Sequence, residues 1–343
     1  MASKKRPQKP VKKARPKGPS AKPKAKTPVA KAPKPKAKAS KPKPKPRKGA
    51  DLDLVRAKKS AGLSDEEKLR ALLEAHELGA RANAILATVL PSIRLVAKPA
   101  AEESIALGAT KIGGAAHLPA GAEWPTNKGA PLAFLAQLDL GALARLMPQG
   151  PLAKHEGLLS FFFDAKEQPW GFPSDGLDGI RVLHHPPRTK LVRRSEGNVV
   201  FTPVAADTFV EPTIPHYRTA RARALVKSGR PFEHYADVVN EWANEGRHAP
   251  RRDGDVHRVL GHPDAIQGDM TRRLEYGLRG FDLEKEVPSA ESAAQTWRLL
   301  LQVDSEDACK MMWGDLGRVF FWIREDDLRA GDWSKVHYQL QCG

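Results

Sequence analysis

The chain contains little cysteine: Cys309 and Cys342 are the only two cysteines among 343 residues. Two thiols cannot form a disulfide framework for a chain this long, and no Cys-x-x-Cys pair is present, so we expect reduced thiols. The N-terminus lacks the apolar core of a secretory signal. The longest early apolar run, residues 84–90, is too short to cross a bilayer. These absences predict a cytoplasmic protein that makes no membrane contact.

The chain also lacks the short motifs that are typical of catalysis or cofactor binding. It has no Gly-x-Ser-x-Gly nucleophile turn, no phosphate-binding Gly-x-x-x-x-Gly-Lys-Ser/Thr loop and no His-Glu-x-x-His metal motif. His184 and His185 are adjacent, so on a strand they point to opposite faces and cannot chelate together. We therefore predict no metal and no cofactor, and the sequence leaves an enzymatic activity uncertain and less favoured than a binding role.

Residues 1–50 contain no acidic residue. They hold 20 of the 57 Lys and Arg residues, whereas residues 51–343 carry 37 basic and 40 acidic groups. Most of the other residues are Pro and Ala, which predicts a disordered segment with nothing to bury. The composition resembles that of linker-histone C-terminal tails and similar bacterial tails that coat DNA. A solubilising arm, a spacer or a tether to an acidic protein is the alternative.

Mobile positive charge binds polyanions by releasing their counterions and reads no bases. We therefore expect residues 1–50 to contact nucleic acid, DNA or RNA, or another polyanion without sequence specificity, and the protein to associate with the nucleoid. The densest part of this basic tail consists of Lys34, Lys36, Lys38, Lys41, Lys43, Lys45, Arg47 and Lys48.

After the tail, the pattern changes twice. Residues 51–91 form a mixed-charge linker followed by an amphipathic helix, which begins at a capping box of Ser64 and Glu67 and is expected to end at Pro91. From residue 92 to 343, short apolar segments alternate with Gly- and Pro-rich turns, which predicts strands. Prolines indicate a loop over residues 202–216. Pro231 indicates the start of a helix that runs to about residue 245.

Two segments far apart in the chain resemble each other. Phe-Leu-Ala-Gln-Leu-Asp at 134–139 matches Leu-Leu-Leu-Gln-Val-Asp at 299–304, an offset of 165 residues. Residues 157–164 match 317–324 at an offset of 160. The shared Gln-x-Asp favours an internal duplication with halves at about 92–200 and 255–343. The alternative is that buried strand pairs look alike because cores look alike.

Several motifs carry a family resemblance. They include Lys-Ile-Gly-Gly at 111–114, Glu-Trp-Pro at 123–125, Leu-Gly-His-Pro at 260–263, Gln-Gly-Asp-Met at 267–270 and Met-Trp-Gly-Asp at 312–315. Together with the two repeats, they resemble the YwqG-like family of uncharacterised bacterial proteins over about residues 90–343. The resemblance implies an α+β fold, a mainly antiparallel sheet with flanking helices. It transfers no activity, cofactor or catalytic residue, and the basic tail lies outside it.

The repeated polar positions are the candidate ligand cleft. On each strand Gln and Asp alternate with apolar residues and share a face. Packing of the two halves would place both pairs in one cleft with aromatic walls, suited to a small polar ligand or a peptide. The alternative is that these side chains satisfy buried loop backbone. The candidates are Trp124, Gln137, Asp139, Gln302, Asp304, Trp313 and Asp315.

Three functional hypotheses follow from the sequence. The first is a binding or interaction module tethered to DNA or another polyanion by its tail. The second is an enzyme that acts on a small polar ligand in the cleft between the two halves. The third is a regulatory or immunity-like partner of another protein. The charge separation at residue 50 and the lack of a catalytic motif favour the first.

Overall fold

The computed structural model describes residues 63–172, 176–197, 199–226, 228–244 and 256–343. The predicted basic tail and most of the predicted linker lie outside the described residues. The described helices are α2 (Asp65–Ala75), α3 (Ala82–Leu86), α4 (Leu140–Leu146), α5 (Ala220–Leu225), α6 (Arg230–Asn244), α7 (Met270–Arg279), α8 (Pro288–Ala294) and α9 (Glu325–Ala330), with 3-10 turns at Gly79–Arg81, Glu102–Ser104 and Trp333–Lys335.

Ten strands form one antiparallel sheet, in the order β14-β13-β12-β11-β1-β10-β2-β6-β7-β8. With the two small strand pairs β3–β9 and β4–β5, this confirms the predicted α+β class with a mainly antiparallel sheet. The strands are β1 (Leu90–Pro99), β2 (Lys111–Ile112), β3 (Ala116–Leu118), β4 (Thr126–Asn127), β5 (Ala130–Pro131), β6 (Ala133–Asp139), β7 (Leu158–Phe163), β8 (Ile180–His185), β9 (Val192–Arg194), β10 (Val204–Thr213), β11 (His257–Val259), β12 (Trp297–Asp304), β13 (Arg318–Arg324) and β14 (His337–Gln341).

The sheet curves until its two ends nearly meet. Phe161 on β7 and Phe321 on β13 lie near opposite ends of the strand order, yet their ring centroids are 5.0 Å apart. At one end of the sheet, the amide of Leu340 on β14 donates to the carbonyl of Trp170 at 3.0 Å. Trp170 lies in the segment that connects β7 to β8, the two strands at the other end. The concave face therefore encloses the main hydrophobic core, to which both ends of the sheet contribute.

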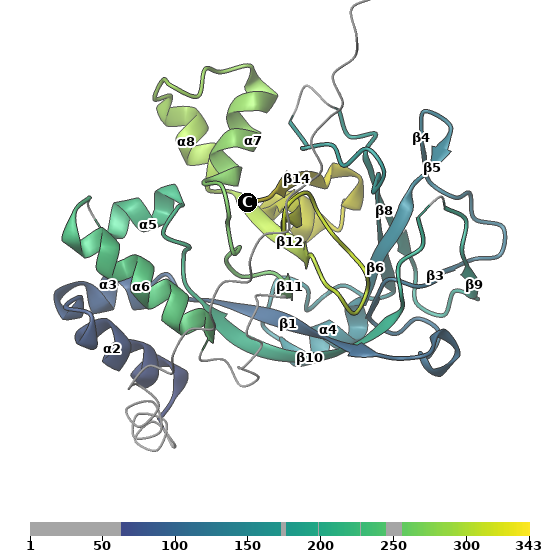
Figure 1. Cartoon of the computed structure of the whole chain (residues 1–343), viewed down its shortest axis with the longest axis horizontal. Helices are drawn as coiled ribbons and strands as arrows, with labels where there is room; N and C mark the ends of the chain where they lie inside the picture. Colours follow the sequence, from purple (N-terminus) through teal and green to yellow (C-terminus); the bar gives the residue numbers. More distant parts are fainter. Residues whose placement is uncertain (1–62, 173–175, 198, 227, 245–255) are drawn as a thin grey trace, which may run out of the picture. The chain divides into compact units, whose positions relative to one another are not determined.

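The longest strands, β1 and β10, pair along their whole length at the middle of the sheet. The predicted loop over residues 202–216 is therefore wrong, because residues 204–213 are strand. Prolines are tolerated there because they lie at the strand's end, where Pro212 faces Pro91. Figure 1 shows this pair as a long ribbon, with α2, α3, α5 and α6 gathered around one end.

These helices share a second core, separate from the sheet's. Leu73, Ile85, Tyr235 and Val238 are fully buried within it. The predicted capping box is confirmed: the Ser64 hydroxyl accepts from the Glu67 amide at 3.2 Å, and the Glu67 carboxylate accepts from the Ser64 amide at 2.7 Å. The first helix ends at Ala75 rather than near Pro91, and Glu77 follows with φ of 59°.

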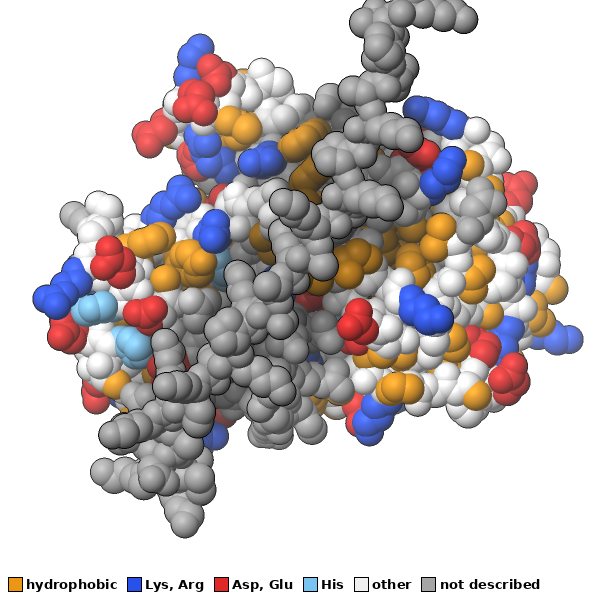
Figure 2. All heavy atoms as spheres, viewed as in Figure 1, with side chains coloured by type: hydrophobic (Ala, Val, Ile, Leu, Met, Phe, Trp, Pro, Cys, Tyr) orange, Lys and Arg blue, Asp and Glu red, His pale blue; other side chains and the backbone are white. Residues whose placement is uncertain are grey.

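The helix predicted from Pro231 is confirmed as α6. None of the described helices is long and apolar enough to cross a membrane. In the view of Figure 2, positive and negative side chains are interspersed over the described surface. This mixing agrees with the near balance of 37 basic and 40 acidic groups in residues 51–343.

Candidate functional site

The two predicted glutamines are buried and tie loops to the sheet. Gln137 accepts from the His117 amide at 3.0 Å and donates to the carbonyl of Ala109 at 2.8 Å. Gln302 accepts from the Asp264 amide at 3.0 Å and donates to the carbonyl of Val256 at 2.6 Å. Each amide thus satisfies two backbone groups that would otherwise be buried without a partner. These contacts match the second interpretation of the sequence, in which the polar side chains satisfy buried backbone and do not line a ligand cleft.

The two predicted aspartates also bind backbone. Asp139 caps α4 by accepting from the Ala142 amide at 3.0 Å. Asp304 accepts from the Val256 amide at 2.8 Å and from the Arg318 guanidinium at 2.7 Å. Burial raises the pKa of the Asp304 carboxyl, although Arg318 acts in the opposite direction. Both side chains therefore fix local structure.

The remaining candidates lie apart from one another. Trp124 packs edge-on against Phe162 at 5.2 Å and belongs to a separate small core. Trp313 is fully buried and donates to the carbonyl of Asp304 at 3.1 Å. Asp315 is exposed. The structure does not gather the seven candidates around one of the cavities described here, and the tail lysines lie outside the described residues.

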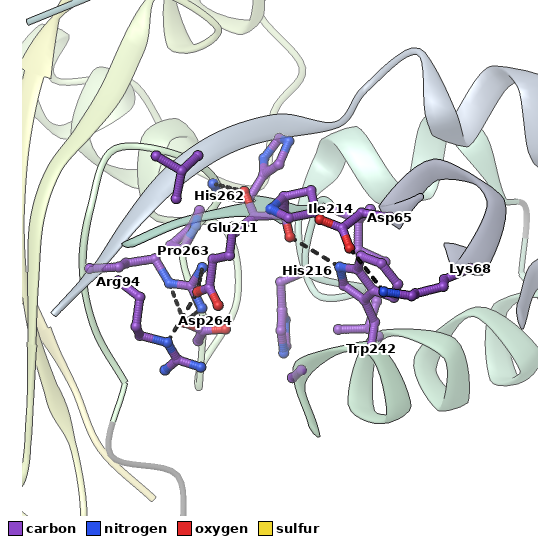
Figure 3. A pocket seen from close by; sticks show the side chains of 16 residues that line it. Asp65, Lys68, Arg94, Glu211, Ile214, His216, Trp242, His262, Pro263 and Asp264 are labelled. Carbon is purple, nitrogen blue, oxygen red and sulfur yellow. Dashed lines mark hydrogen bonds and ion pairs between the residues drawn. The ribbon is translucent and has the colours of Figure 1, made fainter. Parts of the chain in front are cut away.

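A cavity of about 150 Å³ lies where the β1–β10 pair meets the helices. We call it the Arg94 cavity. Figure 3 shows its two sides: charged groups of the sheet on one side, and His216, Ile214 and Trp242 on the other. Its lining residues are Asp65, Lys68, Arg94, Val210, Glu211, Pro212, Thr213, Ile214, His216, Val239, Trp242, Ala243, Arg258, His262, Pro263 and Asp264.

Two arginines face each other on neighbouring strands of the sheet side. Arg94 of β1 pairs in register with Arg258 of β11, and both side chains are largely buried, with exposures of 14% and 5%. Like charges directly opposite are destabilising. Burial lowers the pKa of Arg94, and Arg258 beside it lowers that pKa further. This pair of cations therefore needs anions close by.

Two carboxylates supply part of that charge. Glu211 Oε1 lies 3.1 Å from Arg94 Nε and 3.2 Å from Arg258 Nη1. Asp264 Oδ2 lies 2.8 Å from both Nε and Nη2 of Arg258. Burial alone would raise the pKa of Asp264, but Arg258 and Arg318 outweigh it and lower the pKa to about 2. Asp264 is therefore a permanent anion at neutral pH.

Two groups in this network keep unused hydrogen-bonding capacity. Within the described residues, Glu211 is the one ion-pair partner of Arg94, and it lies at Nε, so both terminal nitrogens remain available. Asp264 uses Oδ2 for Arg258 and Gln302, whereas Oδ1 has no hydrogen-bond partner there. A donor and an ionised acceptor are thus left over at one cavity.

The helical side of the cavity is mostly apolar, and its two charged residues, Asp65 and Lys68 of α2, pair with each other at 3.5 Å. Ile214 and Val239 are buried, and the Trp242 indole donates to the carbonyl of Pro212 at 3.1 Å, which fixes its ring. Burial lowers the pKa of His216 to about 4, so its ring is uncharged at neutral pH. This side can hold an apolar group, whereas the sheet side can hold charges.

The other half of the sheet has a similar row, which lines none of the cavities described here. Arg94, Arg258 and Gln302 lie in register across β1, β11 and β12, and Ala205, Lys111 and Gln137 do so across β10, β2 and β6. Lys111 is fully buried and lies 2.6 and 2.7 Å from the two carboxylate oxygens of Glu102. Its charge is satisfied internally, while that of Arg94 is only partly satisfied.

Sequence reasoning missed the Arg94 cavity. Arg94 interrupts the apolar run Ile-Arg-Leu-Val at 93–96, which is the one local signal of a buried charge. Glu211 was hidden in the segment read as loop, and Asp264 in a turn. No group of three His, Cys, Asp or Glu side chains among the described residues is placed to hold a metal ion.

A comparison with curated proteins gives no match. A family model described as Domain of unknown function (DUF1963) matches residues 110–342. The match spans the sheet from β2 onward and includes Glu211, Arg258 and Asp264, whereas Arg94 lies before it. Because this model matches more than half of the chain, the chain belongs to the DUF1963 family.

Proposed function

We propose that this protein is a binding module whose Arg94 cavity takes a small zwitterion of the size of an amino acid. The observation that carries this proposal is the unused donor and unused acceptor at one cavity. The terminal nitrogens of Arg94 would bind the ligand's carboxylate, and Asp264 Oδ1 its ammonium group. Trp242 and Ile214 would contact its side chain.

Charge and size both favour this ligand class. Arg94 and Arg258 are matched by Glu211 and Asp264, so a ligand without net charge keeps the cavity neutral. A volume of about 150 Å³ is below the roughly 300–1,000 Å³ of pockets that hold drug-sized ligands. A free amino acid or the end of a peptide fits these limits better than a nucleotide or a larger metabolite.

Calorimetry with the full-length protein tests the proposal. The free amino acids are screened, and the best binder is compared with its amide, which lacks the carboxylate, and its N-acetyl form, which lacks the ammonium group. Both derivatives should bind at least about tenfold more weakly, since each loses a charge-assisted hydrogen bond. Arg94→Gln should abolish binding. Lys98→Gln is the matched control, because Lys98 lies on the same strand with its side chain 59% exposed. Binding that survives Arg94→Gln would contradict the proposal.

We also propose that residues 1–50 tether this module to DNA or another polyanion. The support is the charge separation: all of the net positive charge lies in this segment. The described body carries mixed charge on the surface seen in Figure 2, so it offers no competing basic face there. Attraction between the tail and a polyanion is electrostatic and independent of base sequence.

We further propose that the sheet arose by internal duplication. Gln137 and Gln302 make matching backbone bonds, and a bulge precedes each of them, at 134/136 and 299/301. Gly113 and Gly114 have φ of 64° and 71°, and Leu260 and Gly261 have φ of 63° and 74°. A leucine in this conformation is strained, which inheritance of the turn would explain. The first half would then include β10 and the second half β1, and both strands lie beyond the predicted boundaries of those halves.

Within the DUF1963 family, we infer that the chain belongs among the YwqG-like proteins. The motifs from residue 111 to residue 315 support this narrower placement. A sequence profile built from YwqG-like proteins alone should score this chain above other DUF1963 members, and a score no higher than theirs would contradict the inference.

A further inference from the structure

A second cavity of about 260 Å³ lies over the outer side of β12 and β13. Its apolar floor is formed by Met270, Leu299 and Trp322, and Ala224 of α5 and Ala294 of α8 line its sides. We call it the Trp322 cavity. It borders the Arg94 cavity at His262 and Pro263 but shares no charged group with it. The helices that contribute lining residues are α5, α7 and α8, which are labelled in Figure 1.

Trp322, which helps to form this floor, carries an unpaired donor. The Trp322 side chain is 3% exposed, and its indole nitrogen has no hydrogen-bond partner in the described part of the chain. The indoles of Trp124, Trp242, Trp297 and Trp313 all donate to oxygen atoms of the protein. A buried donor without an acceptor is costly and uncommon. An acceptor atom of a ligand would satisfy it.

The rim of the cavity carries spare positive charge. Asp269 is occupied by the amides of Ala220 and Arg272 at 2.6 and 3.1 Å. Glu291 is occupied by Arg272 at 2.5 Å and by the Tyr276 hydroxyl at 2.6 Å. The acidic groups are therefore used within the protein.

Among the arginines of the rim, Arg298 is paired with Glu325. Arg221 on α5 is exposed, and no carboxylate among the described residues pairs with it. The free charge at the rim is thus a cation, and a ligand with a terminal anionic group would complement it.

We propose that the Trp322 cavity binds a small amphipathic oxo-acid. Its apolar body lies on Met270 and Leu299, its neutral carbonyl oxygen accepts from the Trp322 indole, and its carboxylate lies near Arg221 at the rim. This site differs from the Arg94 cavity in ligand class, because it provides one neutral donor and one cation and leaves no carboxylate for an ammonium group.

The test uses the ¹⁵N-labelled full-length protein and the indole region of its ¹H–¹⁵N spectrum. The sequence has seven tryptophans, and the indole signal that is missing from Trp322→Phe identifies Trp322. Three probes are titrated: 3-benzoylpropionate, its amide, and 4-phenylbutyrate, which lacks the ketone. 3-Benzoylpropionate should shift the Trp322 signal saturably. The other two should bind about threefold to fivefold more weakly, since each loses one polar contact.

Variants separate the two polar contacts. Arg221→Gln should weaken 3-benzoylpropionate about threefold to fivefold and remove its advantage over the amide. Trp322→Phe lacks the reporter signal, so its binding is measured by calorimetry, and this variant should lose the advantage of 3-benzoylpropionate over 4-phenylbutyrate. Arg223→Gln, on the same helix but outside the cavity, is the matched control and should change nothing.

Two outcomes would overturn the proposal. In the first, no probe shifts the Trp322 signal. In the second, all three shift it with equal affinity, unchanged by Arg221→Gln, which would make this an unspecific apolar cavity. Arg221 is exposed, so its substitution gives a readout even if Trp322→Phe does not fold. Arg94→Gln should leave this binding intact, so this test and that of the Arg94 cavity fail independently.

Discussion

At the scale of single residues, Lys111 shows how this fold tolerates a buried charge. Its side chain has no exposed surface, and its amine bonds to both carboxylate oxygens of Glu102 and to the carbonyl of Ala115 at 2.9 Å. Burial lowers the pKa of Lys111, whereas Glu102 acts against that shift. Gly114 lies so close that a Cβ there would meet both charged groups. The pair is therefore closed to ligands and serves stability.

Removing the carboxylate should expose the cost of that burial. Glu102→Gln leaves the Lys111 charge buried without its counterion, and we expect the free energy of unfolding to fall by about 3–5 kcal/mol. Urea denaturation measures it. Glu103→Gln, the exposed neighbour, should change stability by less than about 0.5 kcal/mol. Equal losses in both variants would show that the ion pair is not the cause.

Buried histidines predict a loss of stability in mild acid. Burial lowers the pKa of His117 and of His262 to about 4, from 6.5. Between these values the unfolded chain binds more protons, so the free energy of unfolding falls as the pH drops from 6.5 toward 4. Each histidine contributes on the order of 3 kcal/mol, which is fully present above pH 6.5.

Urea denaturation at pH 7.5, 6.0, 5.0 and 4.5 tests this expectation. The midpoint should fall steadily below pH 6.5, and His262→Gln should flatten the profile because it removes one of the titrating groups. If the wild type and the variant show parallel profiles, His262 does not carry the effect.

At the scale of elements, local signals predicted what local interactions determine. The capping box at Ser64 and the helix from Pro231 could be predicted, because the residues that form a cap or a helical face lie close together in the sequence. For β10 the sequence predicts a loop, because prolines dominate the local pattern. Its pairing with β1 is set more than a hundred residues away in the sequence. The cavity on that pair was therefore unpredictable too.

The polar positions of the repeats were found, but their role was left open. Alternation with apolar residues shows that Gln137 and Gln302 each lie on the polar face of a strand. It does not show which groups they contact. The backbone segments that they bind, at 109 and 117 and at 256 and 264, are distant in sequence. Only the folded structure distinguishes a buried loop anchor from a cleft residue.

These anchors should contribute to stability. Gln302→Leu would leave the Asp264 amide and the Val256 carbonyl without partners, and we expect a loss of about 3 kcal/mol in the free energy of unfolding. Under the proposed duplication, Gln137→Leu should cost a similar amount. Gln295→Leu, at an exposed position, is the control. Denaturation curves measure all three, and a negligible loss for Gln302→Leu would return that residue to the candidate ligand groups.

At the scale of the whole molecule, the sheet and the helices have different structural roles. The curved sheet encloses the main core, and the helices cover one end of the β1–β10 pair and the outer side of β12 and β13. Both proposed ligand sites lie at these borders between layers, where packing is incomplete. Substitutions at these borders would therefore change the bound ligand without changing the core. Under the proposed tether, the basic tail would decide where in the cell the proposed ligand is bound.

The tail should make binding to DNA strongly dependent on salt. The full-length protein and a chain that begins at Asp51 are compared by fluorescence anisotropy on one labelled duplex, with a second duplex of scrambled sequence. If the tail neutralises Z phosphates, log K falls with log[salt] at a slope of roughly −0.9Z, so six or more contacts lose on the order of 10³ in affinity between 50 and 200 mM salt. Both duplexes should bind equally, because charge alone carries no base recognition.

The chain that begins at Asp51 has 37 basic and 40 acidic groups, and it should therefore bind neither duplex measurably at 50 mM salt. Retained affinity in this shorter chain would place the DNA contact on the folded body and refute the tether. Weak binding of duplex DNA by the full chain, together with tight binding of poly-glutamate, would assign the tail to an acidic protein partner. Electrostatics permits either partner, since 20 cationic side chains attract any dense polyanion, and the ratio of these two affinities decides between them.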